Sequence, residues 1–96
     1  MSDLSGVTAR RVFVSGRVQG VGFRAGTVEA ALRSGVVGWV RNTEDGRVEV
    51  HVQGPGAAVV EFERWLEKGP RWARVDALSA RNLEIDSTLE TFEIRW

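Results

Sequence analysis

The sequence predicts a single α+β domain in which two helices cover one face of an antiparallel sheet. The stretch Arg47–Gln53 alternates valines with polar residues, which is the period of a strand that is buried on one side. Two other stretches carry apolar residues at helical spacing, and a glycine follows each of them. The length of 96 residues suits one domain and leaves no room for two.

The composition predicts a folded domain rather than a disordered chain. Hydrophobic residues make up 43% of the chain and charged residues 27%, which is ordinary for a globular protein. Only residues 1–9 are small and polar without a clear pattern, and we expect them to form a flexible tail. The folded domain is therefore expected over residues 10–96.

The first third of the chain predicts a strand, a glycine-rich loop and a helix. Arg10–Ser15 alternates like a strand, with its valines on one face. Gly16–Gly22 forms the loop, and the helix spans about Phe23–Ser34, where Gly35 ends it. Gly26 is a poor helix former that costs about 1 kcal/mol relative to alanine. The apolar stripe of this helix is expected to consist of Val28, Ala31 and Leu32.

The middle of the chain predicts a β-hairpin. Val36–Asn42 is its first strand, Asp45-Gly46 is a turn signal, and Arg47–Gln53 is its second strand. The valines of the second strand point to one side and are expected to be buried. The other side is expected to contact water and carries Arg47, Glu49, His51 and Gln53.

The last third predicts a second helix and two more strands. Gly54-Pro55 begins the helix, because proline suits a first helical turn, and Gly69-Pro70 ends it. Strands are expected over Ala73–Ala80, where the apolar positions slip and indicate a bulge, and over Leu89–Trp96. The inner face of the helix is expected to carry Val59, Phe62 and Leu66, with Trp65 alongside.

The order of these elements narrows the fold class. Strand, helix, strand, strand, helix and strand, with a short closing strand, give an α+β sandwich with both helices on one face of the sheet. The split βαβ pattern predicts a ferredoxin-like βαββαβ sandwich with an antiparallel sheet.

Charge and residue usage exclude several kinds of site. Thirteen basic residues balance thirteen acidic ones, and a net charge of zero argues against a broad basic face for nucleic acid. The chain has no cysteine and a single histidine, His51, so we expect no thiolate chemistry, metal or cofactor. No apolar run is long enough for a membrane span, and residues 1–9 do not resemble a signal peptide. We therefore expect a cytoplasmic protein.

The loop Gly16–Gly22 is the first candidate site, because it joins a strand to a helix. Its three glycines let the main chain turn tightly and point successive N–H groups inward, which is typical of an anion site. Arg24 follows in the first helical turn, where its planar guanidinium suits two oxygens of a phosphate. A nucleotide P-loop is excluded, because no Lys-Ser or Lys-Thr pair follows the glycines. Taken alone, the loop is also consistent with a plain turn, and Arg24 with a solvated charge.

Other polar and aromatic residues have ordinary explanations when each is taken alone. Asn42 lies at the end of a strand before a hairpin turn, which is typical of an asparagine that binds its own main chain. His51 is expected on the exposed face of its strand rather than at a catalytic centre. The four tryptophans are more typical of packing than of a ligand platform.

Two longer motifs resemble the signatures of a known family. Val14–Arg24 (VSGRVQGVGFR) resembles the first acylphosphatase signature, and Gly38–Gly54 (GWVRNTEDGRVEVHVQG) resembles the second. Both run without a gap, and the spacing between them fits the family. The similarity continues through Gly69-Pro70 and residues 73–75, so it covers about residues 10–96. Two long signatures in order are far more specific than a single glycine motif.

The resemblance implies a fold, an activity and a set of site residues. Acylphosphatases are small ferredoxin-like domains that hydrolyse acyl phosphates to a carboxylate and inorganic phosphate. The resemblance implies that Arg24 binds the phosphoryl group and that Asn42 positions the attacking water. The chain departs from the family at Ala25 and Gly26, where many members carry larger residues, and this departure affects the acyl side of the site. The implied phosphate cradle consists of Ser15, Gly16, Arg17, Val18, Gln19, Gly20 and Val21.

Two other functions share parts of this pattern. RNA-recognition modules have the same βαββαβ order, but they stack bases on aromatic residues of the central strands, and Arg47–Gln53 has none. Acylphosphatase-like domains also occur within larger proteins that process carbamoyl phosphate. We favour a stand-alone, monomeric enzyme that acts on a small acyl phosphate and has no nucleic-acid or membrane partner.

Overall fold

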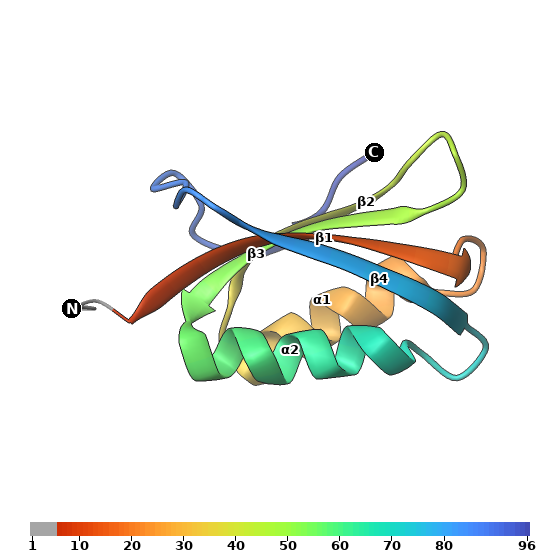
Figure 1. The fold of residues 1–96 in the computed structure, drawn as a ribbon, viewed down its shortest axis with the longest axis horizontal. Helices are drawn as coiled ribbons and strands as arrows, with labels where there is room; N and C mark the ends of the chain where they lie inside the picture. The colour runs from red at the N-terminus through yellow and green to blue at the C-terminus, as the bar shows by residue number, and fades with distance from the viewer. Residues whose placement is uncertain (1–5) are drawn as a thin grey trace.

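The computed structural model describes residues 6–96, which form two layers (Figure 1). Five strands form one sheet in the order β4-β1-β3-β2-β5, and two helices pack against one of its faces. This arrangement confirms the predicted ferredoxin-like α+β sandwich. In chain order the elements are β1 (Val7–Arg17), α1 (Phe23–Ser34), β2 (Val37–Asn42), β3 (Val48–Pro55), α2 (Gly56–Lys68), β4 (Arg74–Leu83) and β5 (Phe92–Ile94).

The sheet is mixed rather than purely antiparallel, so that part of the prediction is wrong. The first four strands pair antiparallel, but β5 runs parallel to β2, with Gly38 opposite Phe92. The chain leaves β4 at the end of the sheet where β2 begins. After crossing to the far edge, it therefore runs in the same direction as β2. β5 is also shorter than the predicted strand Leu89–Trp96.

β1 begins earlier than the sequence pattern indicates. Val7 pairs with Pro55 and Ala9 with Gln53, and Ala9 is only 2% exposed. The prediction of a flexible tail is therefore wrong for residues 7–9, and residues 1–5 of that tail lie outside the described residues. The pattern missed this extension because ladder hydrogen bonds between main chains do not require apolar side chains.

The hydrophobic core lies between the sheet and the two helices. The valines of β3, which were predicted to be buried, have no exposed surface, and neither do two valines that share one face of β1. α2 adds Phe62 and Leu66 from its predicted inner face. Full burial of such a side chain stabilises a fold by roughly 1.5–3 kcal/mol. The core therefore fixes α1 and α2 against the sheet. The buried valines are Val12, Val14, Val48, Val50 and Val52.

The opposite face of β3 is also buried, and the prediction that it contacts water is wrong. β3 is the central strand, so long side chains from both neighbouring strands lie over its polar residues. The Glu49 carboxylate lies 3.2 Å from Arg11 Nε and 2.7 Å from an Arg41 guanidinium nitrogen. The His51 ring stacks on Trp39. Three residues predicted to be exposed have relative exposures of only 4%, 7% and 5%: Glu49, His51 and Gln53.

α1 has the predicted bounds but buries a different stripe. Of the predicted residues, Ala31 is buried and Val28 is half-buried, whereas Leu32 is 72% exposed. Thr27 lies in the core instead, because its hydroxyl donates to the Phe23 carbonyl at 2.7 Å and so has a partner within the helix. The residues of α1 that are buried are Phe23, Thr27, Ala30 and Ala31.

Gly26 is the point at which the two helices approach each other. A Cβ atom at this position would lie 3.0 Å from the ring of Trp65 on α2 and 3.6 Å from Pro70. The glycine weakens α1 locally, but it makes room for the tryptophan ring against the helix. The absence of a side chain at Gly26 therefore allows α1 and α2 to pack closely.

The predicted bulge is confirmed, and it lies in β4. The register of β1 against β4 shifts at Gly16, and Asp76 is the extra residue. Gly16 has a φ of +127°, and a Cβ there would lie 2.2 Å from the carbonyl oxygen of Arg74. Only glycine allows the two strands to approach so closely at this point.

The remaining boundaries differ by a few residues from the predictions. β2 begins at Val37, β4 continues to Leu83, and β3 includes Pro55, so that α2 begins at Gly56. Pro55 precedes the helix rather than lying in its first turn. In the part of the chain that the structure describes, no helix has the length and apolar character needed to cross a membrane.

Candidate functional site

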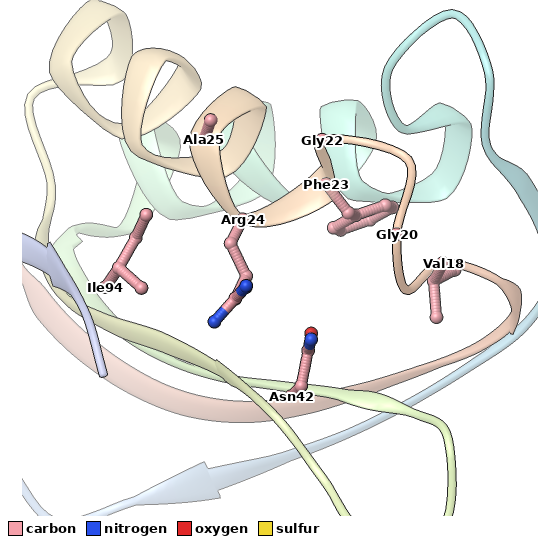
Figure 2. A pocket seen from close by; sticks show the side chains of 8 residues that line it. All are labelled: Val18, Gly20, Gly22, Phe23, Arg24, Ala25, Asn42 and Ile94. Atoms are coloured by element: carbon pink, nitrogen blue, oxygen red, sulfur yellow. The ribbon is translucent and has the colours of Figure 1, made fainter. Parts of the chain in front are cut away.

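A small cavity lies where the turn between β1 and α1 meets the end of β2 (Figure 2). Its volume is about 160 Å³. Pockets for drug-sized ligands are roughly 300–1,000 Å³, so this cavity suits a small group such as a single phosphate. Its lining consists of Val18, Gly20, Gly22, Phe23, Arg24, Ala25, Asn42 and Ile94.

The turn of residues 18–22 borders this cavity and leaves main-chain donors unpaired within the described part of the chain. Gly20 and Gly22 have φ values of +76° and +80°, which side-chain-bearing residues rarely adopt. Within residues 6–96, no hydrogen bond uses the main-chain N–H groups of residues 19–22. Gly22 also provides no side-chain cap to α1, whose first turn has no acidic residue. The turn and the helix terminus therefore offer unpaired N–H groups and a positive dipole end to an anion.

Arg24 extends from the first turn of α1 toward Asn42 (Figure 2). No carboxylate among the described residues forms an ion pair with its guanidinium. The guanidinium carbon instead lies 4.3 Å from the centroid of the Trp96 ring, and this ring is itself 91% exposed. Arg24 is therefore held by an aromatic face, while its charge remains available for a ligand.

Asn42 reaches the cavity from the last position of β2. Its Oδ1 is buried and accepts no hydrogen bond within the described residues. A buried acceptor without a partner costs about 1–3 kcal/mol, so it is rarely left unpaired without a reason. The Asn42 side chain therefore does not bind its own main chain, as an ordinary turn asparagine would. It is free to bind a water or a ligand in the cavity.

The structure brings together only part of the predicted phosphate cradle. Val18 and Gly20 line the cavity, and Val21 packs partly buried against the hydrophobic core. The side chain of Gln19 binds the hairpin after β2 instead. Three predicted residues lie in β1, where they pair with β4 and do not line the cavity: Ser15, Gly16 and Arg17.

Sequence reasoning missed the contribution of the C-terminal segment. Ile94 lines the cavity, and Trp96 stacks on Arg24, because β5 pairs with β2 beside the start of α1. Nothing in the local pattern of residues 92–96 indicates this position, since it depends on the crossing from β4 to the far edge. Phe23 was also missed, although its position directly before Arg24 was a usable signal.

His51 and the acidic residues do not form a second centre. His51 lies on β3, away from the cavity, with its Nε2 3.0 Å from Oε1 of Gln53. In residues 6–96, no three histidine or acidic side chains gather as metal ligands would. The polar side chains that line the cavity are therefore one guanidinium and one amide, those of Arg24 and Asn42.

Comparisons with known proteins agree on one family. A family model described as Acylphosphatase matches residues 10–94. The acylphosphatase of Anaeromyxobacter dehalogenans is 49% identical over 86 residues, which cover 90% of this chain and 92% of that protein. The one from Nitrosococcus oceani is 47% identical over 89 residues, covering 93% and 99%. The crystal structure of the Bacillus subtilis acylphosphatase superimposes with a TM-score of 0.89 at 34% identity, covering 93% of this chain and 99% of that one.

Proposed function

The chain belongs to the acylphosphatase family, and from that premise we propose how its cavity hydrolyses acyl phosphates. Acylphosphatases cleave the bond between the acyl oxygen and phosphorus, which yields a carboxylate and inorganic phosphate. Phosphoryl transfer asks a protein mainly to position the reactants and to stabilise charge on the equatorial phosphate oxygens. The residues around the cavity supply both.

Arg24 and the N–H groups of residues 19–22 bind the phosphoryl group. The planar guanidinium can donate to two phosphate oxygens at once, and the third oxygen faces the main-chain turn. The absence of a competing carboxylate at Arg24, within residues 6–96, supports this assignment. These donors match the charge on the equatorial oxygens, so they stabilise the transition state.

Asn42 orients the attacking water, and its unpaired buried Oδ1 is the observation that carries the proposal. This oxygen can accept a hydrogen bond from a water held opposite the leaving group. A side-chain amide is far too weak a base to deprotonate that water, so its role is to position the nucleophile. The water proton passes to a phosphate oxygen of the substrate as the new P–O bond forms.

The leaving group needs no general acid. Breaking the bond between phosphorus and the acyl oxygen releases a carboxylate, whose conjugate acid has a pKa of about 4. It departs as an anion at neutral pH, and the products are the carboxylate and dihydrogen or monohydrogen phosphate. This chemistry agrees with a cavity whose lining has no histidine and no carboxylate.

The oligomeric state, the compartment and the substrate class are also part of this proposal. We expect a monomer that acts in the cytoplasm on small acyl phosphates, without a metal or cofactor and without a nucleic-acid partner. Ala25 is small and Ile94 is apolar, so neither supplies a polar group that would select one acyl group over another.

Two variants of Asn42 test the proposed role. Asn42→Ala should lower kcat by about 100-fold or more, because the water is no longer positioned, while phosphate should still inhibit. Asn42→Asp places a carboxylate beside the phosphoryl group, and this like-charge contact should weaken phosphate binding below that of Asn42→Ala. The measurements are kcat and the inhibition constant of inorganic phosphate at neutral pH.

The Asp variant separates orientation from base catalysis. A carboxylate is nearly isosteric with the amide and is a much stronger base, so it would restore or raise turnover if proton removal limited the reaction. Wild-type turnover in Asn42→Asp would therefore contradict the water-orienting role of Asn42.

A further inference from the structure

The side chain of Gln19 joins the two sides of the active-site cavity. Its Nε2 donates to the Thr43 carbonyl at 2.9 Å and to the Arg47 carbonyl at 2.8 Å. These carbonyls lie at the neck of the hairpin between β2 and β3. Both amide hydrogens are used, so the orientation of the side chain is fixed.

The hairpin does not need Gln19 to satisfy these carbonyls. The Thr43 carbonyl also accepts from the Gly46 N–H, and the Arg47 carbonyl also accepts from the Thr43 N–H. Each carbonyl therefore keeps a donor when Gln19 is removed. The two extra hydrogen bonds instead tie the turn of residues 18–22 to the hairpin.

The residues next to each end of this link line the cavity. Gly20 follows Gln19 in the turn, and Asn42 precedes Thr43 at the end of β2 (Figure 2). We propose that Gln19 is a positioning residue that sets the separation between the phosphate-binding N–H groups and the amide of Asn42. The proposal rests on the proposed function, because it assumes that phosphate and water occupy these two sides.

The link should affect turnover more than phosphate binding. Arg24 and the N–H groups of residues 19–22 belong to one continuous segment, so phosphate stays bound when the link is broken. Asn42 belongs to a different strand, and its distance from the bound phosphate depends on how the turn meets the hairpin. A displacement of about 1 Å at such a site can cost about 100-fold in rate.

Gln19→Met tests this role, because methionine has a similar length and no amide donor. We expect kcat to fall by about 10- to 100-fold, while the inhibition constant of inorganic phosphate changes by less than about threefold. Gln19→Glu should be more severe, because its carboxylate oxygens would face two carbonyl oxygens. Thermal unfolding of both variants is measured alongside, to show that the protein is folded during the assay.

Gln53→Met is the matched control. The Gln53 side chain also clamps main chain, since its Nε2 donates to the Asp86 carbonyl at 2.9 Å and its Oε1 accepts from the Asp86 N–H at 3.0 Å. It lies at the other end of the sheet and does not line the cavity. Gln53→Met should lower the unfolding temperature and leave kcat unchanged.

A double-mutant cycle shows whether Gln19 acts through Asn42. If it does, Asn42→Ala should cost much less turnover in the Gln19→Met background than in the wild-type protein. A residue that only stabilises the fold would give additive effects, as Gln53→Met is expected to give with Asn42→Ala.

The possible outcomes separate this inference from the proposed function. Wild-type kcat in Gln19→Met, or full additivity with Asn42→Ala, would overturn the positioning role of Gln19 alone. Wild-type turnover in Asn42→Ala would overturn the proposed function itself. A loss of kcat with nearly unchanged phosphate inhibition, coupled to Asn42, would support the positioning role.

Discussion

Two turns meet at one end of the sheet, at the right of Figure 1, and they satisfy their polar groups differently. The hairpin turn of residues 43–47 forms internal hydrogen bonds: the Thr43 N–H donates to the Arg47 carbonyl, and the Gly46 N–H donates to the Thr43 carbonyl. The turn of residues 18–22 leaves the N–H groups of residues 19–22 without a partner among the described residues. The comparison shows that the fold satisfies the donors of one turn and leaves those of the other unused, which is what the proposed phosphate site requires.

The side chains of the hairpin also form hydrogen bonds with one another, whereas those of residues 18–22 do not. In the hairpin, the Thr43 hydroxyl donates to the Asp45 carboxylate and, together with Arg47, lowers the pKa of that carboxyl below its usual range. Because the folded pKa is lowered, the stabilisation is present above the ordinary carboxyl pKa and is lost as the pH falls through the folded value. The contribution of the Asp45 carboxylate to the stability of the hairpin is therefore fully present at neutral pH. The turn of residues 18–22 has no such internal pair.

The largest expected effect comes from replacing the Arg24 guanidinium, which lines the cavity. Arg24→Ala and Arg24→Lys should both lower kcat/KM by about 1,000-fold or more, because lysine lacks the planar fork that binds two oxygens. Inhibition by phosphate should weaken in both variants. Steady-state kinetics with a generic acyl phosphate measure the effect.

Arg10→Lys is the control for this experiment. The Arg10 guanidinium also donates to two oxygens at once, since it binds both carboxylate oxygens of Glu63 at 2.7 and 3.3 Å. Arg10 does not line the cavity. Its kinetics should be unchanged. Near-normal kinetics in Arg24→Lys would mean that only positive charge matters at that position.

Gly20 and Gly46 allow a direct test of the two turns. Both have positive φ, at +76° and +91°, and a Cβ at either position would meet nothing within 4 Å. Alanine should therefore cost about 1–2 kcal/mol of stability in each, from backbone strain alone. Only Gly20 lines the cavity, so Gly20→Ala should also lower kcat/KM by about tenfold or more.

The measurements for this pair are thermal unfolding and steady-state kinetics. Equal losses of activity in Gly20→Ala and Gly46→Ala would show that strain at this end of the sheet, rather than the open turn, limits the reaction.

A smaller effect is expected from changing the acyl group. In the proposed mechanism the donors of the open turn and Arg24 serve the phosphoryl end, and the apolar lining residues Ala25 and Ile94 offer no polar group to an acyl chain. We expect kcat/KM for acetyl, benzoyl and carbamoyl phosphates to agree within about tenfold. One strongly preferred substrate would indicate a dedicated acyl pocket.

The smallest expected effect comes from removing metal ions. The leaving carboxylate needs no acid, and Arg24 with the main-chain donors can neutralise the phosphoryl charge, so exhaustive chelation should leave kcat unchanged. Activity that is lost on chelation and restored by magnesium would contradict the proposed mechanism.

Local patterns predicted the helices and the strands, whereas the resemblance to the two family signatures indicated the two residues that carry the proposed chemistry. The bounds of α1 and the bulge in β4 follow from glycine positions and apolar spacing, which depend on neighbours in the chain. Arg24 and Asn42 were found because each belongs to a long motif. The structure adds that these two residues face one cavity, although they come from different elements.

Local patterns failed where burial depends on distant segments. The polar face of β3 was expected to contact water, yet Glu49 is buried because β1 and β2 each supply an arginine to it. Thr27 lies in the core in place of Leu32, because the face of α1 that packs against the rest of the domain is not the one that the apolar spacing indicates. Alternation along a strand or helix shows which residues share a face, but it does not show what covers that face.

The family and the order of the elements follow from the amino-acid sequence, and so does the proposal that residues 18–22 bind an anion, because glycine positions and motif spacing are properties of the chain. The complete fold is needed to place β5 parallel to β2, which brings Ile94 to the cavity and Trp96 onto Arg24. It also decided that the Gln19 side chain binds the hairpin rather than the cavity. These contacts join residues that are far apart in the chain, so their geometry is fixed only when the sheet is complete.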